Sequence, residues 1–399
     1  MERQILTFRE LIAPVEPEIF FAEYYRKKAL HIPGPEEKFA EVYSWEDLNA
    51  LIGMSTIWTD KSFEMALNGR NLGFQEYCYP GSEREGGQAK RPDFRRVQEL
   101  LRQGATLALD FIDLLTPGLR SLTHTLEAVI GAPVTASSFA SWRQTPGYSS
   151  HFDTQNVFAC HIAGTKVWRI YQGRMQNAAE VPGARSPDYK SEHHEKAKGA
   201  VQQEVTMTPG DLLYIPHGQY HDALAATDSC LHVSFGVCHL IAQDFVNLLM
   251  HEMYKVPAFR EHLPHFDDEA AQEASLKSIA DQLREIILQP QIGRQLKDYM
   301  RQKAFERMAD FDLPSPERSS RFRIRWLGKQ LARHGQGWQL DDGKTKTKLD
   351  NAEGKAAKWM MRRDFFCAAN LAEALGDDAP ENPSALLEKL RQAGLIEPM

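Results

Sequence analysis

Three side chains in a β-rich part of the sequence have the types and spacing of a metal site. His151 and Asp153 are separated by one residue at the start of a predicted strand over residues 152–162, which is rich in β-branched and aromatic residues. Side chains two positions apart on a strand leave the same face, with Cα atoms roughly 6.6 Å apart, so both can reach one ion. His221 follows an apolar strand predicted over residues 212–215 and a turn, and it is the candidate third ligand.

Two histidines and one carboxylate that leave other positions of the metal open are typical of non-haem Fe(II) oxygenases. A bare H-x-D pattern with a distant histidine is a weak signal in a chain with 14 histidines. The β-rich context strengthens it, and so does Lys166, which lies on the next predicted strand. A lysine that points into a barrel must pair with an anion, so Lys166 is a candidate partner for the far carboxylate of a dicarboxylate co-substrate. Taken alone, Lys166 is better explained as a surface residue.

The other histidines have simpler explanations. His217 lies in a Pro-His-Gly turn four residues before His221, and we keep it as the weaker alternative ligand. His193 and His194 lie in a polar segment, so solvent exposure is the simpler prediction for both. His232 is a weak candidate for lining the site.

The predicted elements around these residues alternate between strands, turns and one long helix. A helix is expected from Thr116–Pro117 to Gly131, with leucines at three- and four-residue spacing on one side. The polar segments 81–92 and 173–203 are expected to be loops, the second unusually long. Further strands are expected over residues 104–109, 134–142 and 231–237, and amphipathic helices over 243–255, 269–289 and 290–308.

Composition points to an ordinary globular protein with a basic region near its end. The chain has 399 residues, a net charge of −7 and five scattered cysteines without a CxxC pattern. No secretory leader and no membrane-spanning stretch is expected, which favours a cytoplasmic protein with reduced thiols. Residues 318–363 hold 13 Lys and Arg against 4 Asp and Glu, so this region has a surplus of nine positive charges. Nucleic acid or an acidic partner could contact only this region, although a solvated basic face explains it about as well.

The sequence resembles the JmjC/cupin-like Fe(II)- and 2-oxoglutarate-dependent oxygenases, in particular the ribosomal-oxygenase branch, which hydroxylates ribosomal proteins. The resemblance rests on HFDTQNVFACHIAGTKVW and PGDLLYIPHGQYH, and it extends to GATLALDFIDLLTPGLRSLTHTLEAVIGAPV and YYRKKALHIPG. It implies that His151, Asp153 and His221 bind iron, that Lys166 binds the 2-oxoglutarate C5 carboxylate, and that Ser234 lies beside the co-substrate.

The resemblance also implies a domain order. It predicts an N-terminal α+β region over residues 1–100 and a double-stranded β-helix (jelly-roll) catalytic domain over 101–240. A helical dimerisation region over 241–310 and a winged-helix-like domain over 318–399 follow. The implied protein is a homodimer.

The implied reaction is hydroxylation of an amino-acid side chain of a protein, with a ribosomal protein as the expected substrate and O₂ and 2-oxoglutarate as co-substrates. One alternative is the same chemistry on a peptide natural product or small metabolite. Another is demethylation of N-methyl-lysine, which would release formaldehyde. A third is a cupin that only binds ligands, which the intact set of His151, Asp153, His221 and Lys166 disfavours.

Overall fold

The structure is a computed structural model, and it describes residues 6–82, 87–142, 145–306, 321–325, 329–341, 345–363, 365–367, 371, 375–376, 379–380 and 382–398. The chain divides into two compact units. One comprises Met1–Ile130, Val134–Cys238 and Asp310–Met399, and the other comprises Gly131–Pro133 and His239–Ala309. The sequence DFDLPSPERSS over residues 310–320 predicts a linker, and this segment lies outside the described residues. None of the helices in the described ranges is long and apolar enough to cross a membrane.

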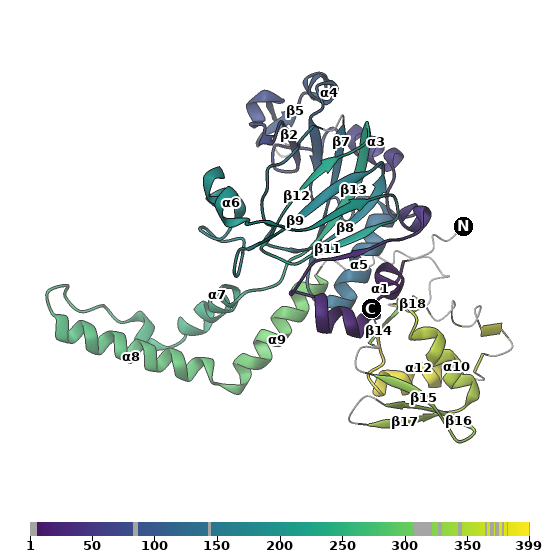
Figure 1. The fold of residues 1–399 in the computed structure, drawn as a ribbon. Coiled ribbons are helices and arrows are strands. Elements are labelled where there is room, and N and C mark those ends of the chain that lie inside the picture. The colour runs from purple at the N-terminus through teal and green to yellow at the C-terminus, as the bar shows by residue number, and fades with distance from the viewer. Residues whose placement is uncertain are drawn as a thin grey trace. The chain divides into compact units, whose positions relative to one another are not determined.

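Two antiparallel β-sheets form the core of the first unit (Figure 1). The larger sheet contains, in spatial order, β1 (Leu30–Ile32), β11 (Leu212–Ile215), β8 (Asn156–Ala163), β13 (Ser229–Val237), β7 (Val134–Trp142), β6 (Thr106–Leu109), β2 (Phe63–Leu67) and β3 (Arg70–Asn71). The smaller sheet contains β10 (Val201–Met207), β9 (Lys166–Arg174) and β12 (Gln219–Ala225). From β8 to β13 the chain passes repeatedly from one sheet to the other, which confirms the predicted double-stranded β-helix.

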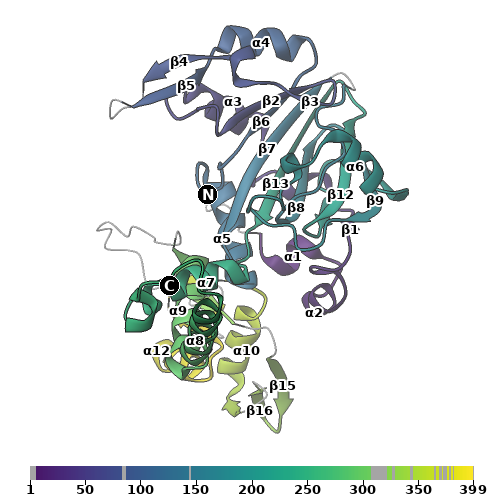
Figure 2. The same cartoon turned by 90° about the vertical axis from the view of Figure 1, so that its left-hand side faces the viewer.

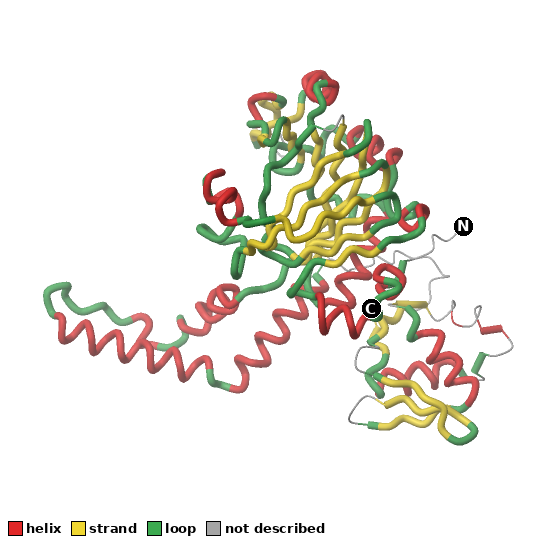
Figure 3. The backbone as a smooth tube through the Cα atoms, in the orientation of Figure 1, coloured by secondary structure: helices red, strands yellow, loops and turns green. Residues whose placement is uncertain are grey.

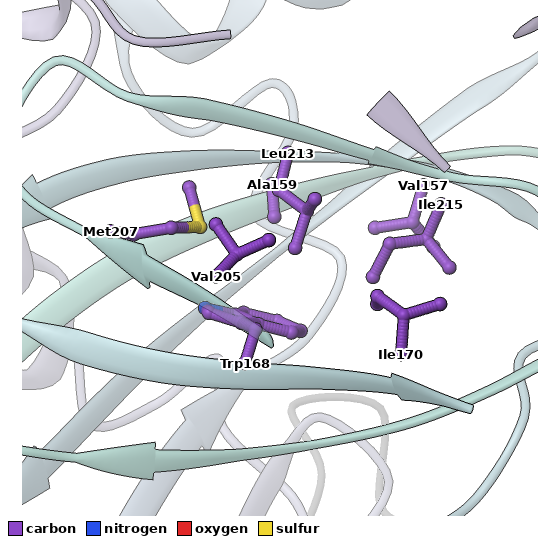
Figure 4. Close-up of a cluster of buried hydrophobic side chains, with 8 residues drawn as sticks. All are labelled: Val157, Ala159, Trp168, Ile170, Val205, Met207, Leu213 and Ile215. Carbon is purple, nitrogen blue, oxygen red and sulfur yellow. The ribbon is translucent and has the colours of Figure 1, made fainter. Parts of the chain in front are cut away.

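The two sheets face each other across an apolar core. Figure 2 shows β7, β13 and β8 on one side and β12 and β9 on the other. Figure 4 shows side chains of β8 and β11 pointing toward those of β9 and β10. The eight side chains of this cluster are almost fully buried: Val157, Ala159, Trp168, Ile170, Val205, Met207, Leu213 and Ile215. Because side chains alternate between the two faces of a strand, every second side chain of each strand lies in this layer between the sheets.

Helix α5 (Pro117–Ile130) follows its sequence signals closely. The Thr116 hydroxyl accepts a hydrogen bond from the Leu119 amide at 3.2 Å, and Pro117 occupies the first turn. Gly131 follows the helix with φ +73°, a conformation that glycine adopts without strain. The leucines on the inner side of the helix are buried, as predicted.

Two predicted loops of the first unit contain regular structure. Most of residues 81–92 belong to two paired antiparallel strands, β4 (Cys78–Ser82) and β5 (Gln88–Pro92). Nothing in the sequence signals them, because hydrogen bonds between backbones need no apolar side chains. The segment 173–203 contains a 3₁₀ turn (Ser186–Asp188), α6 (Ser191–Ala197) and the first residues of β10. The loop prediction is therefore confirmed for most of residues 175–190 and wrong for the ends of the segment, which belong to β9, α6 and β10. Ala197 at the end of α6 packs on a buried aromatic cluster.

The remaining elements of the first unit surround the sheets or belong to the C-terminal region. Near the N-terminus these are α1 (Phe8–Ile12), α2 (Pro17–Ile19), a π-helix (Phe20–Tyr24), 3₁₀ turns (Glu36–Phe39 and Phe74–Glu76), α3 (Trp45–Gly53) and α4 (Phe94–Arg102). The C-terminal region has β14 (Arg321–Ile324), β15 (Gln330–His334), β16 (Gly337–Asp341), β17 (Lys346–Leu349), α10 (Asn351–Met360), β18 (Phe365–Cys367), α12 (Pro383–Gln392) and β19 (Ile396–Pro398). Its strands pair in two small sheets. The winged-helix assignment and the four domain boundaries stay predictions.

The second unit is helical, and Figure 3 shows its helices in red. It contains α7 (Ala242–Met253), a 3₁₀ turn (Pro257–Arg260), α8 (Glu269–Ile287) and α9 (Pro290–Phe305). The three predicted helices are confirmed, with ends that differ by up to three residues, and residues 307 and 308 of the last prediction lie outside the described residues. Leu249, Ile286 and Ile292 form its small buried core.

Candidate metal centre and co-substrate pocket

The backbone holds the two candidate histidine ligands next to each other. His221 lies on β12, and His151 pairs with it as an isolated antiparallel bridge. The His151 amide donates to the His221 carbonyl at 3.0 Å, and the His221 amide donates to the His151 carbonyl at 2.9 Å. Their ring centroids are 4.5 Å apart. Main-chain pairing therefore sets the separation of the two imidazoles.

The predicted strand over residues 152–162 was wrong at its start. His151 pairs with β12 of the smaller sheet, whereas β8 begins only at Asn156, which pairs with β13 of the larger sheet. Residues 152–155 cross between the sheets and cannot pair with both. Phe152 is buried in an aromatic cluster, whereas His151 and Asp153 on either side of it are only partly buried and line the cavity.

His151, Asp153 and His221 have a geometry that fits one metal ion. Their candidate ligand atoms all lie within 4.8 Å of one another. Asp153 Oδ1 lies 3.7 Å from His151 Nε2, and Asp153 Oδ2 lies 3.5 Å from His221 Nε2. Ligand atoms at about 2.1 Å from an octahedral ion lie about 3 Å apart, so small side-chain shifts would complete the site.

Hydrogen bonds set the tautomer of both histidines. His151 Nδ1 lies 2.9 Å from the Ser149 carbonyl oxygen, and His221 Nδ1 lies 3.0 Å from the Gln219 carbonyl oxygen. A carbonyl only accepts, so each Nδ1 carries a hydrogen and each Nε2 presents a lone pair toward Asp153. Burial lowers the pKa of His221, and the neighbouring His151 lowers it further. The neutral imidazole that a metal requires is therefore the favoured form.

A second hydrogen-bond network joins the two metal-site segments through the residues next to the histidines. Asp222 Oδ2 accepts hydrogen bonds from the Ser150 hydroxyl at 2.6 Å and from the Tyr171 hydroxyl at 2.5 Å. Lys198, just after α6, donates to Ser150 Oγ at 3.1 Å and pairs with Glu195 at 2.7 Å. The 173–203 segment is thus attached to the histidine pair.

Removing the Asp222 carboxylate should loosen the metal site. Asp222→Ala leaves the Ser150 and Tyr171 hydroxyls without their acceptor, and we expect at least about tenfold weaker metal binding, as for other outer partners of metal ligands. Titration of Mn(II) into the full chain measures the effect. Glu204→Gln, which removes an exposed pair with Arg169 on the neighbouring strands, is the matched control. Equal Mn(II) affinity in wild type and Asp222→Ala would contradict a positioning role.

The turn before β9 places Lys166 at the inner face. Gly164 has φ +74°, and a Cβ there would lie 2.1 Å from the Ser229 carbonyl oxygen, so only glycine fits this turn. Lys166 is 5% exposed. Its Nζ lies 3.5 Å from Ser141 Oγ and 3.4 Å from His232 Nδ1.

Lys166 is a buried cation without an acidic partner among the described residues. Burial lowers the pKa of Lys166 to about 8. Burial also lowers the pKa of His232 well below its usual value, and Lys166 lowers it further, so His232 is neutral and can accept from the ammonium. Ser141 Oγ is 3.0 Å from Thr106 Oγ1. Such a polar, uncompensated ammonium is expected where an anionic ligand binds.

One cavity of about 670 Å³ joins the two sites. His221 lies opposite Ile170 and Ala225 lies opposite Lys166, so His221 and Lys166 share the inner face of the smaller sheet. Ser234 on β13 also lines this cavity, as the predicted placement beside a co-substrate requires. The volume is typical of a small-molecule site.

The other histidines occupy places outside the three-residue cluster. His217 lies near Arg174, whose Nε donates to the His217 carbonyl at 3.0 Å. His194 is half-buried, with Nδ1 3.0 Å from the Tyr220 hydroxyl, so the expected solvent exposure was wrong for it. His232 lines the cavity and stacks on Phe139 with ring centroids 4.8 Å apart.

Sequence reasoning missed several polar residues of the cavity. Most of them lie on strands far from the H-x-D segment in sequence, whereas Asp110 directly follows β6 and Tyr148 lies three residues before His151. Their only signal in the sequence is a single polar side chain within or next to an apolar segment. They are Glu64, Thr106, Asp110, Ser137, Ser141 and Tyr148.

Comparison with known proteins agrees with this architecture. Residues 117–245 match the JmjC domain family. Ribosomal oxygenase 2 of Bos taurus is 27% identical over 217 residues, which cover 54% of this chain and 44% of that protein. The bifunctional lysine-specific demethylase and histidyl-hydroxylase NO66 of Drosophila willistoni is 25% identical over 252 residues, or 62% of this chain and 30% of that protein. The match thus spans less than half of either relative.

A solved structure extends the likeness to nearly the whole chain. The X-ray structure of E. coli ycfD is 15% identical, with a TM-score of 0.51 over 96% of this chain and 98% of that one. This likeness concerns the fold. The two facing sheets, the histidine–aspartate cluster between them and the similarity of residues 117–245 to the JmjC domain family agree with the resemblance found in the sequence.

Proposed function

We propose that the chain is an Fe(II)- and 2-oxoglutarate-dependent dioxygenase that hydroxylates an amino-acid side chain of a protein. The observation that carries this proposal is the placement, in one cavity, of a two-histidine, one-carboxylate cluster and a buried lysine without an acidic partner among the described residues. The names of the curated relatives support a ribosomal protein as the substrate.

Each part of the cavity has a role in this proposal. His151, Asp153 and His221 would hold iron, and Lys166 would pair with the distal carboxylate of 2-oxoglutarate. Iron(II) with 2-oxoglutarate and O₂ supplies an oxidant that inserts one oxygen atom into a C–H bond, with succinate and CO₂ as co-products. The rings of Trp168 and Phe139 stack on His221 and His232 and form an apolar wall beside these polar groups, where electrostatic pairing is stronger than in water.

The chemistry is tested by incubating the purified full chain with Fe(II), ascorbate, O₂ and 2-oxoglutarate. We expect succinate that forms only with iron, together with one bound Fe(II) per chain. A chain that binds iron but forms no succinate, even with a ribosomal-protein extract, would contradict the proposal. Formaldehyde release with lysine-methylated protein would instead indicate demethylation.

We also propose that the helical unit forms a homodimer. Its helices and the segments between them carry large apolar side chains that are exposed in the single chain. The most exposed of them are Phe266 (76%), Leu263 (75%), Leu288 (69%), Leu276 (66%) and Tyr254 (63%). A second copy with two-fold symmetry is the commonest way to cover such surface.

The dimer prediction is tested by light scattering of the full chain at micromolar concentration. We expect the mass of two chains. Leu276→Glu on α8 should yield monomers, because it places a charge on the exposed apolar surface, while Lys277→Glu beside it should not. A monomeric wild-type chain would contradict the prediction.

The basic C-terminal region is proposed to contact an acidic or RNA-bearing partner in the cytoplasm, and the buried thiols of Cys160 and Cys230 suit a reducing compartment. Deleting residues 318–399 should then weaken action on an intact ribosomal particle more than on a short peptide. Comparison of both substrates for the two chains measures this. Equal losses on both substrates would show that the region supports folding instead.

A further inference from the structure

The small sheet of β15, β16 and β17 in the C-terminal region has one face that packs on α10 (Figure 1). Trp338 on β16 lies opposite Arg333 on β15 and Leu349 on β17, so these three side chains share a face. Gly354 of α10 lies so close to the Trp338 ring that an added Cβ would be 2.0 Å from Trp338 Cδ1. The ring is thus held between the sheet and the helix.

The Arg333 guanidinium is held in one orientation beside this ring. Its Cζ lies 4.3 Å from the centre of the Trp338 ring, and its Nη1 donates a hydrogen bond to Asn351 Oδ1 at 2.6 Å. Arg333 is nevertheless exposed. A guanidinium has five N–H donors, so other donors and its outer plane can meet a ligand. Such a fixed, planar cation matches phosphate oxygens and the faces of nucleobases.

A row of further cations continues from Arg333 along the outer side of α10. Lys355 and Lys358 are exposed, and so is Arg362 just after the helix. Residues three or four positions apart lie on one side of a helix, so these three side chains form one row. Lys358 Nζ lies 5.9 Å from the centre of the Trp338 ring. The row and Arg333 therefore border the same aromatic ring.

The carboxylates near this row are engaged elsewhere. Glu353 on α10 pairs with Lys389 of α12 at 2.6 Å. Asp350 caps α10 by accepting a hydrogen bond from the Glu353 amide at 2.8 Å. Asp341 pairs with Lys346 at 3.7 Å, and both lie on the opposite face of the sheet from Trp338. The surface around the ring thus suits an anionic partner with several charges.

We propose that the surface formed by Arg333, Trp338, Lys355, Lys358 and Arg362 binds single-stranded RNA. This inference deepens the proposed function, because it rests on contact between the basic C-terminal region and an acidic or RNA-bearing partner and assigns that partner as RNA. Phosphates at regular intervals match a row of separate cations. A guanidinium that is stacked on a tryptophan can also stack on an unpaired base. An acidic peptide would use the charges but not the planar stack.

Fluorescence anisotropy of a labelled single-stranded RNA, titrated with the full chain, tests the surface. A length of about 12 nucleotides is within the range of known single-strand sites. We expect binding that weakens with salt. The logarithm of the association constant should fall with the logarithm of the salt concentration with a slope of about −2 to −3, the value for about three to four phosphate contacts.

Two kinds of variant separate charge from stacking. The double variant Lys355→Gln, Lys358→Gln should make this slope shallower by about 1.4 and weaken binding at low salt by at least about tenfold. Arg333→Lys keeps the charge but loses the planar stack, so the slope should stay and the affinity should fall by at least about fivefold.

The double variant Lys346→Gln, Lys348→Gln is the matched control. It removes two exposed charges from the opposite face of the same sheet and should leave the slope unchanged. Equal losses in the two double variants would overturn the inference, because only the net charge would then matter.

Three further results would also overturn the inference. The first is a wild-type chain that does not bind the RNA. The second is tighter binding of a poly-glutamate peptide of equal charge. The third is RNA binding that is lost only together with a large fall in Tm, because the exposed side chains would then be structural. The titrations contain neither Fe(II) nor 2-oxoglutarate and measure no turnover, so failure of the proposed reaction and failure of this inference are distinguishable.

Discussion

Replacing His151 or Asp153 by alanine is expected to abolish the conversion of 2-oxoglutarate to succinate, a loss of more than about a hundredfold. Replacing a residue that only hydrogen-bonds to a metal ligand already lowers metal affinity or activity ten- to a hundredfold. Replacing a ligand itself should lower both by more. His221→Ala should behave in the same way. Succinate formation and iron content of the purified variants measure the result.

His217→Ala is the matched control, because His217 lies four residues before His221 but outside the cluster, near Arg174. Most activity and all of the bound iron should remain. Loss of iron in this variant, with iron retained in His221→Ala, would reverse the assignment of the third ligand.

Lys166→Ala is expected to raise the KM for 2-oxoglutarate by at least about thirtyfold while iron affinity stays nearly unchanged. Removing one partner of a buried, charge-assisted pair costs roughly 2–5 kcal/mol, and 1.4 kcal/mol is a factor of ten. Arg169→Ala is the matched control, since this cation lies on the same strand but faces outward and is paired with Glu204. Unaltered dependence on 2-oxoglutarate in Lys166→Ala would show that the lysine does not contact the co-substrate.

The same lysine predicts a pH dependence. The pKa of Lys166 is lowered to about 8, so the ammonium is present below this pH and is lost above it. The KM for 2-oxoglutarate should therefore rise as pH increases through about 8. An arginine at this position keeps its charge throughout this pH range. If the larger guanidinium fits, the KM of Lys166→Arg for 2-oxoglutarate should not depend on pH. A wild-type KM that is independent of pH between 7 and about 9.5 would contradict the prediction, because the charge would then not contribute to binding.

The residues that sequence reasoning found share a local signal. Lys166 follows a glycine turn that begins a strand, and the strands β7 and β11 have alternating or apolar patterns with clear ends, so these parts were predicted closely. Residues 152–155 were not, because no local pattern tells which sheet His151 joins. That choice depends on pairing with β12, far along the chain.

The partners of the polar groups around the site also could not be predicted from local sequence patterns. Asp222 holds Ser150 across two segments, and Glu64 approaches Asp110 only through the β2–β6 register. Each of these contacts joins residues far apart in the sequence, and a single polar residue within a strand has many possible partners. The segment 173–203 was misjudged for a related reason, since its few apolar residues bury themselves against distant aromatic rings.

The central claim is that this cavity uses iron and 2-oxoglutarate to oxygenate a polypeptide, and ¹⁸O₂ labelling tests it most directly. Ribosomal proteins from cells that lack the gene are incubated with the full chain, Fe(II), 2-oxoglutarate and ¹⁸O₂, and the products are sequenced by mass spectrometry. We expect one ¹⁸O atom at a single side chain of one protein, absent when 2-oxoglutarate is omitted or when Asp153→Ala replaces the wild type. Succinate formation without ¹⁸O in any polypeptide would contradict the claim.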